Sequence, residues 1–469
     1  MYLLNIMLIN NIMHKVYIII FAIILILAVY LKRNININIT IFIYLVLLRG
    51  LICQNKFWWD VSDMLGINKS GIKLFNMIED RTKNNFYTLQ IANKDVNIVL
   101  NNDNVKEILD NSPHIFGVGD LKYNYYKEIM EKNVSVSNMP EWQERRKMND
   151  DILMNNKIHS ILNNLIKYSQ AVILYNPIPT KPEHFKEISK LITTFIVFGE
   201  KTEIPDNFFN IFKDASSISM LNGSVNICPY AKAAFINTIN QNMNRCTKGH
   251  KSLIERANLL NYNDREELLH QVPNWILPIF DIVNTLLPRL LCLLTNHPEY
   301  FARVAEEVKR IYNDKEIYAS AINCHTPFIR NCILETVRLN NPIIALSRTL
   351  REDNFKFDNY HKKFKQGDQF LILCAGFLRN SKYFFSPNQF IPDRWKDDCL
   401  ENKYCSLMWS QGPQKCPGKE LSIMIIKIML IFIMIKLDFN ISKLKCTHIL
   451  NNNDIDTINP YKLNFEYYE

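Results

Sequence analysis

The chain contains 469 residues, of which 48% are hydrophobic and 22% are charged. This balance excludes an intrinsically disordered chain, and the length is sufficient for a large buried core. The formal charge of +9 does not predict a nucleic-acid partner, because the densest basic run, "HKKFK" at 361–365, is better explained as the solvated edge of a β-hairpin.

The N-terminal region is expected to anchor the chain in a membrane. Residues 16–31 carry no charge and are followed at once by Lys32 and Arg33. As a helix this block covers about 24 Å, slightly less than the roughly 30 Å hydrocarbon core of a bilayer, so we place the span at about 13–31. No small-residue cleavage site follows, which favours an uncleaved anchor over a signal peptide. A buried core helix is the third interpretation.

The distribution of cations predicts which side of the membrane the rest of the chain occupies. Lys15 precedes the span. The cations that follow it are Lys32, Arg33, Arg49 and Lys56. Because positive charges stay on the cytoplasmic side, we expect a single-pass anchor within 1–56 and a domain that faces the cytosol. A possible second apolar segment at 39–48 would reverse this orientation if it spanned the membrane, unless Arg49 and Lys56 hold the cytosolic side.

From 57 to 469 the sequence predicts one mainly α-helical domain, because no repeat and no long linker interrupts it. Apolar residues recur at intervals of three and four, which is typical of helices. The predicted helices are 157–170, 184–198, 265–297, 298–312 and 421–437. Pro288 is expected to kink the third of these, and Lys427 favours a buried core helix over a membrane span for the last. Short β-favouring runs at 343–375 predict a small antiparallel sheet.

Cysteine usage points away from disulfides and towards one particular loop. The eleven cysteines include no Cys-x-x-Cys pair, so neither a disulfide framework nor a zinc ribbon is predicted. In "WSQGPQKCPGKE", residues 409–420, Gly412 and Gly418 flank Cys416. A cysteine held in such a loop can offer its thiolate to iron. Taken alone, however, the pattern favours a buried structural thiol.

Two charged motifs precede this loop. Glu335 and Arg338 are three residues apart in "ILETVR", so both project from one face of a helix. Arg394, in "FIPDRW" at 390–395, offers a second cation to the same carboxylate. A helical Glu-x-x-Arg is usually a surface ion pair, but the order and distance of these motifs relative to Cys416 favour a shared role.

Together these motifs resemble those of the cytochrome P450 superfamily, the haem-thiolate monooxygenases. The haem loop of that family reads Phe-x-x-Gly-x-Arg-x-Cys-x-Gly, and Glu-x-x-Arg and Pro-x-Arg motifs precede it. The matching positions are Trp409, Gly412, Cys416 and Gly418, then Glu335 and Arg338, then Pro392 and Arg394. The resemblance covers roughly 57–469 and is strongest from residue 326 onward.

The resemblance implies the cytochrome P450 fold, a single large helical domain with a small β region, and haem b as the cofactor. Cys416 would be the axial ligand of the iron. The other residues that the resemblance assigns to the haem are Trp142, Arg146, Arg348, Trp409, Gly412 and Gly418. Among these, Arg146 and Arg348 would pair with the haem propionates.

Part of the resemblance concerns structure rather than catalysis, and one cation is missing. Glu335, Arg338 and Arg394 would form a buried structural triad behind the haem. Gln414 stands where the family has its haem-loop arginine, so one propionate partner is lost, and the neighbouring Lys415 is a candidate to compensate.

A further departure lies in the predicted central helix. In the family, an acid and a threonine about fifteen residues before a His-Pro step deliver protons to dioxygen. Counting back from the step at 297–298 places Asp281 at the acid position and Ile282 at the threonine position. Thr285 lies four residues after Asp281 on the same face, and either it or Asn284 could order the water that relays a proton. Alternatively, Asp281 only bends the helix or caps its neighbours.

The resemblance implies an oxidoreductase. We expect a haem-dependent monooxygenase that inserts one oxygen atom from O2 into a hydrophobic substrate, with electrons from a separate NAD(P)H-dependent reductase and with membrane lipid as a further partner. Because Ile282 replaces the threonine, an isomerase, dehydratase or peroxygenase that needs no O2 activation remains an alternative. A non-catalytic haem-binding or lipid-binding membrane protein is another.

Overall fold

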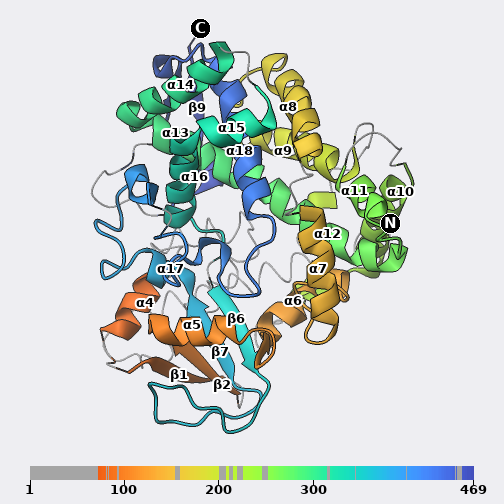
Figure 1. Ribbon diagram of the computed structural model, residues 1–469, viewed down its shortest axis with the longest axis vertical. Helices are drawn as coiled ribbons and strands as arrows, with labels where there is room; N and C mark the ends of the chain where they lie inside the picture. The colour runs from red at the N-terminus through yellow and green to blue at the C-terminus, as the bar shows by residue number, and fades with distance from the viewer. Residues whose placement is uncertain are drawn as a thin grey trace.

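The computed structural model describes residues 72–468 except for some short segments. The exceptions are 81, 83, 92–93, 154–158, 200–207, 211–214, 219–224, 246–251, 314–316, 344, 398, 449 and 451–456. The expected membrane anchor within 1–56, including the second apolar segment at 39–48, therefore lies outside the described residues. Helices form most of the described chain, and one sheet lies at one end of the molecule (Figure 1).

Along the described chain, α-helices alternate with short helical turns and strands. The α-helices are α4 (Ile72–Glu79), α5 (Asn102–Asp110), α6 (Asp120–Met130), α7 (Glu141–Leu153), α8 (His159–Leu174), α9 (Pro182–Phe198), α10 (Pro229–Arg245), α11 (Leu253–Leu259), α12 (Arg265–Asp281), α13 (Leu287–Thr295), α14 (Pro298–Asn313), α15 (Ala319–His325), α16 (Pro327–Leu339), α17 (Cys374–Leu378) and α18 (Lys419–Lys436). A π-helical turn, η3 (Ile282–Leu286), joins α12 to α13. The 3-10 turns are η2 (Phe208–Asn210), η4 (Pro392–Trp395), η5 (Leu407–Trp409), η6 (Ile441–Lys443) and η7 (Pro460–Lys462). The strands are β1 (Phe86–Ile91), β2 (Lys94–Val99), β3 (Phe116–Val118), β4 (Ala215–Ile218), β5 (Val225–Ile227), β6 (Ala345–Leu350), β7 (Gln369–Leu373), β8 (Leu444–Cys446) and β9 (Phe465–Tyr467).

The predicted helices are confirmed as α8, α9, α14 and α18, and the one predicted at 265–297 is the continuous run of α12, η3 and α13. Their starts follow from the sequence. Pro182, Pro298 and Pro327 are the first residues of α9, α14 and α16, where a missing N–H costs no helical hydrogen bond. The side chain of Asp264 accepts hydrogen bonds from two N–H groups in the first turn of α12.

Helix α18 runs through the core of the helical part. Every residue from Leu421 to Met434 is buried, and the helix packs against α8 and α16 (Figure 1). Lys427 is also buried, and the expectation of a core helix is confirmed. In the described part of the chain, one helical run, Arg265–Thr295, is long and apolar enough to cross a membrane, but most of it is enclosed by the protein.

The main sheet is larger than predicted and mixed in direction. Its strand order is β1-β2-β7-β6-β3. The predicted antiparallel pair is present as β6 and β7, but β2 pairs with β7 in parallel, with Val96 opposite Gln369. The prediction of a purely antiparallel region was therefore wrong at that pair. Strands β2 and β3 were missed because they pair with β7 and β6, more than 200 residues away in the sequence, where local alternation carries no signal. The local hairpin of β1 and β2 was missed as well.

Candidate active site

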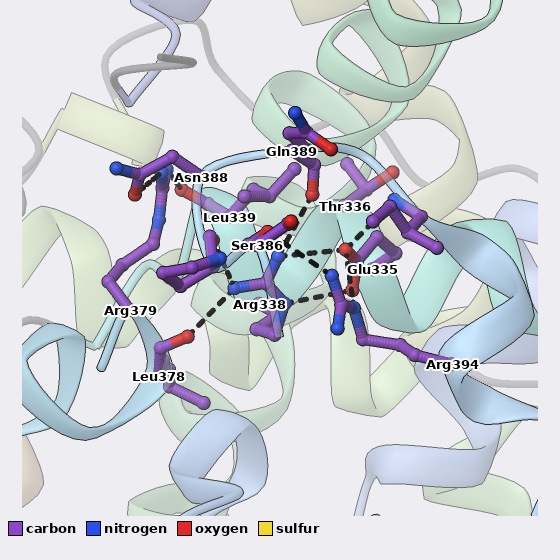
Figure 2. A network of polar contacts seen from close by, with 12 residues as sticks. Glu335, Thr336, Arg338, Leu339, Leu378, Arg379, Ser386, Asn388, Gln389 and Arg394 are labelled. Carbon is purple, nitrogen blue, oxygen red and sulfur yellow. Dashed lines mark hydrogen bonds and ion pairs between the residues drawn. The ribbon is translucent and has the colours of Figure 1, made fainter. Parts of the chain in front are cut away.

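The carboxylate of Glu335 is fully buried and accepts hydrogen bonds from two arginines (Figure 2). Arg338 donates from Nε and Nη2, each at 2.8 Å, and Arg394 donates from Nε at 2.9 Å. The indole N–H of Trp395 at 2.8 Å and the backbone N–H of Ile391 at 3.0 Å also donate to it. The predicted triad of Glu335, Arg338 and Arg394 is thus present in the structure.

These donors decide the charge of Glu335. Burial alone would raise its pKa, but Arg338 and then Arg394 hold the pKa below the usual value, so the carboxylate stays ionised. Arg338 also donates from Nη1 to the backbone carbonyl of Leu378 at 2.8 Å (Figure 2) and to that of Pro387 at 2.6 Å. The triad therefore fastens α16 to the chain that leads into η4. Sequence analysis missed the role of Trp395, although its place directly after Arg394 offered a signal.

The loop that holds Cys416 has the unusual backbone that its glycines predicted. Ser410 and Gly412 have φ values of 60° and 72°, in the left-handed region. A Cβ on Gly412 would lie 2.4 Å from the carbonyl oxygen of Leu109 in α5, so a side chain is excluded there. The N–H of Cys416 donates to the carbonyl oxygen of Trp409 at 2.9 Å. Trp409 and Gly412 thus shape the turn that presents the cysteine.

Several cations surround the sulfur. Burial raises the pKa of the Cys416 thiol, whereas a backbone hydrogen bond from Gly418 and the charges of Arg146, Lys419 and Lys122 act to lower it. A Cβ built on Gly418 would have one neighbour within 4 Å among the described atoms, the Cys416 sulfur at 4.0 Å. A flat group can therefore approach the sulfur over the glycine.

Helix α7 brings the predicted residues Trp142 and Arg146 to this loop. Arg146 donates from Nη1 to the carbonyl oxygen of Lys415 at 2.6 Å and from Nε to Asp150 at 2.9 Å. Trp142 is buried, and its indole N–H has no acceptor among the described residues. The structure thus places Arg146 against the cysteine loop, one turn after the indole of Trp142.

Arg348 lies on β6, opposite Phe370 of β7. It donates from Nε to the Ser112 hydroxyl at 3.1 Å and from Nη1 to the carbonyl oxygen of Ser347 at 2.9 Å. Its Nη2 has no acceptor among the residues that the structure describes. Burial lowers the pKa of Arg348 to about 10, which leaves it a cation at neutral pH.

The predicted acid, Asp281, immediately precedes the π turn η3, and the predicted hydroxyl, Thr285, lies within it. The N–H of Leu287 donates to the carbonyl of Ile282, five residues back, and Pro288, which has no N–H, follows immediately. The irregularity expected at Pro288 is thus a π turn before it. Thr285 donates its hydroxyl hydrogen to the backbone oxygen of Asp281 at 2.8 Å, so its oxygen remains available only as an acceptor.

The carboxyl of Asp281 has two ionisable neighbours that sequence analysis missed. Burial raises the pKa of Asp281 to about 7, and the charge of Arg289 opposes this rise. Arg289 is buried and donates to the carbonyl of Ile458 at 2.9 Å. Burial and then Asp281 raise the pKa of Tyr461. Asp281 and Arg289 are eight residues apart, about two helical turns, so the sequence alone could have predicted that they lie on the same face of the helix.

These residues fit a cofactor that brings its own metal ligands and its own negative charge. In the described part of the chain, no group of three or more His, Cys, Asp or Glu side chains could hold a metal. Cys416 would thus be the single protein ligand on its side of a metal, beside open space at Gly418. Trp142 and Arg348 offer donors without acceptors for acidic groups of such a cofactor. This donor set fits haem b.

Comparison with known proteins finds a similarity to one family. Residues 264–465 match the family model described as Cytochrome P450. This match covers less than half of the chain and shows that this part of it is similar to cytochromes P450. Members of the superfamily bind haem b through a cysteine-ligated iron and are oxidoreductases. The cytochrome P450 match includes Asp281, Arg348 and Cys416, whereas Trp142 and Arg146 precede it and rest on the geometry of α7.

The curated cytochromes P450 that the chain matches are distant. It is 28% identical over 163 residues to cytochrome P450 4c3 of Drosophila melanogaster, which is 34% of this chain and 30% of that protein. It is 25% identical over 173 residues to cytochrome P450 4A2 of Rattus norvegicus, 37% and 34% of the two chains. It is 28% identical over 170 residues to cytochrome P450 52C2 of Candida maltosa, 34% and 32%. The match thus spans about a third of each relative.

Proposed function

We propose that this protein is a haem-thiolate monooxygenase that transfers one oxygen atom from O2 to a hydrophobic small molecule, with electrons from a separate NAD(P)H-dependent reductase. The observation that carries the proposal is the position of the Cys416 sulfur, which lies in a strained loop beside Gly418 and is surrounded by cations. Haem bound there supplies a redox-active iron whose thiolate ligand favours cleavage of the O–O bond.

The chain's own residues divide the work of holding that cofactor. Cys416 offers the thiolate, and the backbone turn at Gly412 sets the direction in which the sulfur points. Trp142 and Arg348 offer N–H groups to the propionates, since neither finds all its acceptors among the described residues. Arg146 supports the loop from outside through its hydrogen bond to Lys415.

Asp281 is the residue that we assign to proton delivery. With a pKa near 7 it is present in both protonation states at neutral pH, as a group that passes protons should be. The Thr285 oxygen can accept a hydrogen bond from a water molecule one turn away, and Asn284 beside it offers both a donor and an acceptor. Arg289 stabilises the ionised form of Asp281 between transfers.

We also propose that the N-terminal segment anchors the enzyme in a membrane with the catalytic domain in the cytosol. The support is the uncharged run at 16–31 and the excess of cations after it. A membrane location would bring the enzyme close to hydrophobic substrates and to a membrane-bound reductase.

A second candidate function follows from Ile282. Because the position of the family's threonine carries no hydroxyl, and because Thr285 uses its hydrogen within the helix, a haem-thiolate isomerase, dehydratase or peroxygenase is the alternative. Such an enzyme would need neither a reductase nor O2.

The two functions are separated by supplying the full chain with reductase, NADPH and O2 and screening fatty acids and sterols as hydrophobic substrates. The proposal predicts a hydroxylated or epoxidised product whose oxygen derives from O2, with one NADPH oxidised for each product at full coupling. Conversion that needs neither NADPH nor O2, or a product whose oxygen derives from added hydrogen peroxide while O2 and NADPH with the reductase give none, would contradict it and favour the alternative.

A further inference from the structure

Lys122, in the first turn of α6, lies beside Arg348 because α6 is fixed to strand β6. Strand β3 pairs with β6 so that Val118 is opposite Arg348, and α6 begins two residues later. The Thr349 hydroxyl accepts a hydrogen bond from the N–H of Asp120 at 3.2 Å and donates to its carboxylate at 3.1 Å. These contacts hold the start of α6 against the strand that carries Arg348.

The charge of Lys122 also acts at the cysteine loop. It is one of the three cations that lower the pKa of the Cys416 thiol, so its ammonium group lies near the sulfur. Burial and the repulsion from Arg348 lower the pKa of Lys122 itself to about 8. Two neighbouring cations in a partly buried site are unfavourable unless an anion lies between them.

No anion of the described chain fills that role. The ammonium group of Lys122 forms no hydrogen bond or ion pair with any described residue, and the same holds for Nη2 of Arg348. The cysteine loop does not supply the missing cation: Gln414 is neutral, the ammonium group of Lys419 is paired with the Glu401 carboxylate, and the Lys415 side chain is exposed. The site thus has two cations that await an acidic group and lacks the family's loop arginine.

We infer that Lys122 replaces the missing loop arginine: together with Arg348 it binds a propionate carboxylate of the haem. The inference rests on the proposed function, because it requires haem at Cys416. The interaction would be a charge-assisted hydrogen bond from the ammonium group to the carboxylate, in a site shielded from water. A carboxylate of an acidic substrate would satisfy the same chemistry, and the experiment separates the two sources.

The test is the rate at which the purified, haem-loaded protein loses haem to an excess of apomyoglobin. Lys122→Met removes the charge and keeps the length of the side chain, and we expect roughly tenfold faster haem loss. Lys122→Arg retains the charge and should keep the slow rate, which separates lost charge from a disturbed fold. Lys127→Met, on the same helix, is the control and should match the wild type. With haem dimethyl ester, whose propionates are uncharged, the wild type and Lys122→Met should lose the cofactor at similar rates.

Equal rates of haem loss for wild type and Lys122→Met would overturn the inference. So would a Lys122→Arg variant that loses haem as fast as Lys122→Met. If Lys122→Met keeps its haem but no longer shows the Soret shift that a fatty acid induces, while the response to the methyl ester is unchanged, Lys122 binds a substrate carboxylate instead. A thiolate-type carbon monoxide spectrum in every variant means that the proposed function stands even when this inference fails.

Discussion

Two carboxylates in this protein have opposite pKa shifts, and their partners explain the difference. Glu335 accepts hydrogen bonds from two arginines, a tryptophan and a backbone N–H, which hold its pKa below the usual value. Asp281 has Arg289 only at a distance, so burial dominates and its pKa rises to about 7. The first carboxylate is therefore suited to a permanent structural charge and the second to proton transfer.

Asp281 makes the activity dependent on pH. Its pKa is raised from an ordinary 3.8 to about 7, so the neutral carboxyl predominates below about pH 7 and is lost as the pH rises through that value. We expect product formation by the wild type to fall between about pH 6 and about pH 8. Asp281→Asn should be roughly a hundredfold slower and show no inflection near pH 7, because the amide cannot supply a proton.

The matched control for that measurement is Asp264→Asn, at the start of the same helix, where asparagine caps as well as aspartate. This variant should retain both the rate and the inflection of the wild type. An inflection that persists unchanged in Asp281→Asn would remove Asp281 from the proton path and support the interpretation that it only shapes the helix.

At the scale of single residues, the sequence was sufficient where a short motif carried the chemistry. Cys416, Gly412 and the Glu335–Arg338 pair could be predicted because their spacing along the chain is itself the signal. Lys122 and Tyr461 could not, because each gains its role from a neighbour far away in the sequence. Trp395 lies between these two cases: it donates to Glu335 and directly follows the Pro-x-Arg motif, but the motif does not include it.

Among the secondary-structure elements, α16 and the segment that ends in η4 are joined by the Glu335 cluster (Figure 2). The carboxylate receives Arg338 from its own helix and Arg394 from η4, and Arg338 reaches on to the carbonyls of Leu378 and Pro387. Removing the carboxylate would leave two cations without their buried partner. The link between helix and segment is therefore a charge contact that the protein cannot easily lose.

The strength of this link can be measured by replacing its carboxylate. Glu335→Gln should lower the free energy of unfolding by about 3–5 kcal/mol, because Arg338 and Arg394 are left buried with a neutral partner. The control is Asp393→Asn, which removes a carboxylate from the more exposed ion pair with Arg303 and should cost about 0–1 kcal/mol. Urea unfolding of the haem-loaded proteins, followed by circular dichroism, gives both values. Similar losses in the two variants would show that burial of the cluster adds nothing.

The helices were predicted more accurately than the sheet for a physical reason. A helix is specified by its own periodicity and by local caps such as Asp264 and Pro298, so α12, α14 and α18 could be read from short windows. The parallel pairing of β2 with β7 depends on tertiary folding. The π turn η3 was anticipated only as a kink at Pro288, because the extra residue in the turn leaves no mark in the periodicity.

For the whole molecule, the fold gathers distant segments around one sulfur. Helix α6 and strand β6 bring Lys122 and Arg348, helix α7 brings Arg146, and the loop before α18 brings Cys416. These cations come from three separate parts of the chain. The cysteine loop itself carries the neutral Gln414 at the position of the family's arginine. This arrangement suits an acidic, iron-containing cofactor at the meeting point, which is the central claim of the account.

That claim is tested most directly by the carbon monoxide difference spectrum of the reduced, haem-supplied protein, with wild type and Cys416→Ser compared at equal haem content. We predict a red-shifted Soret band, characteristic of a thiolate ligand, in the wild type and its loss in the variant. A folded wild-type protein that binds no haem, or a thiolate-type band that survives in Cys416→Ser, would contradict the account.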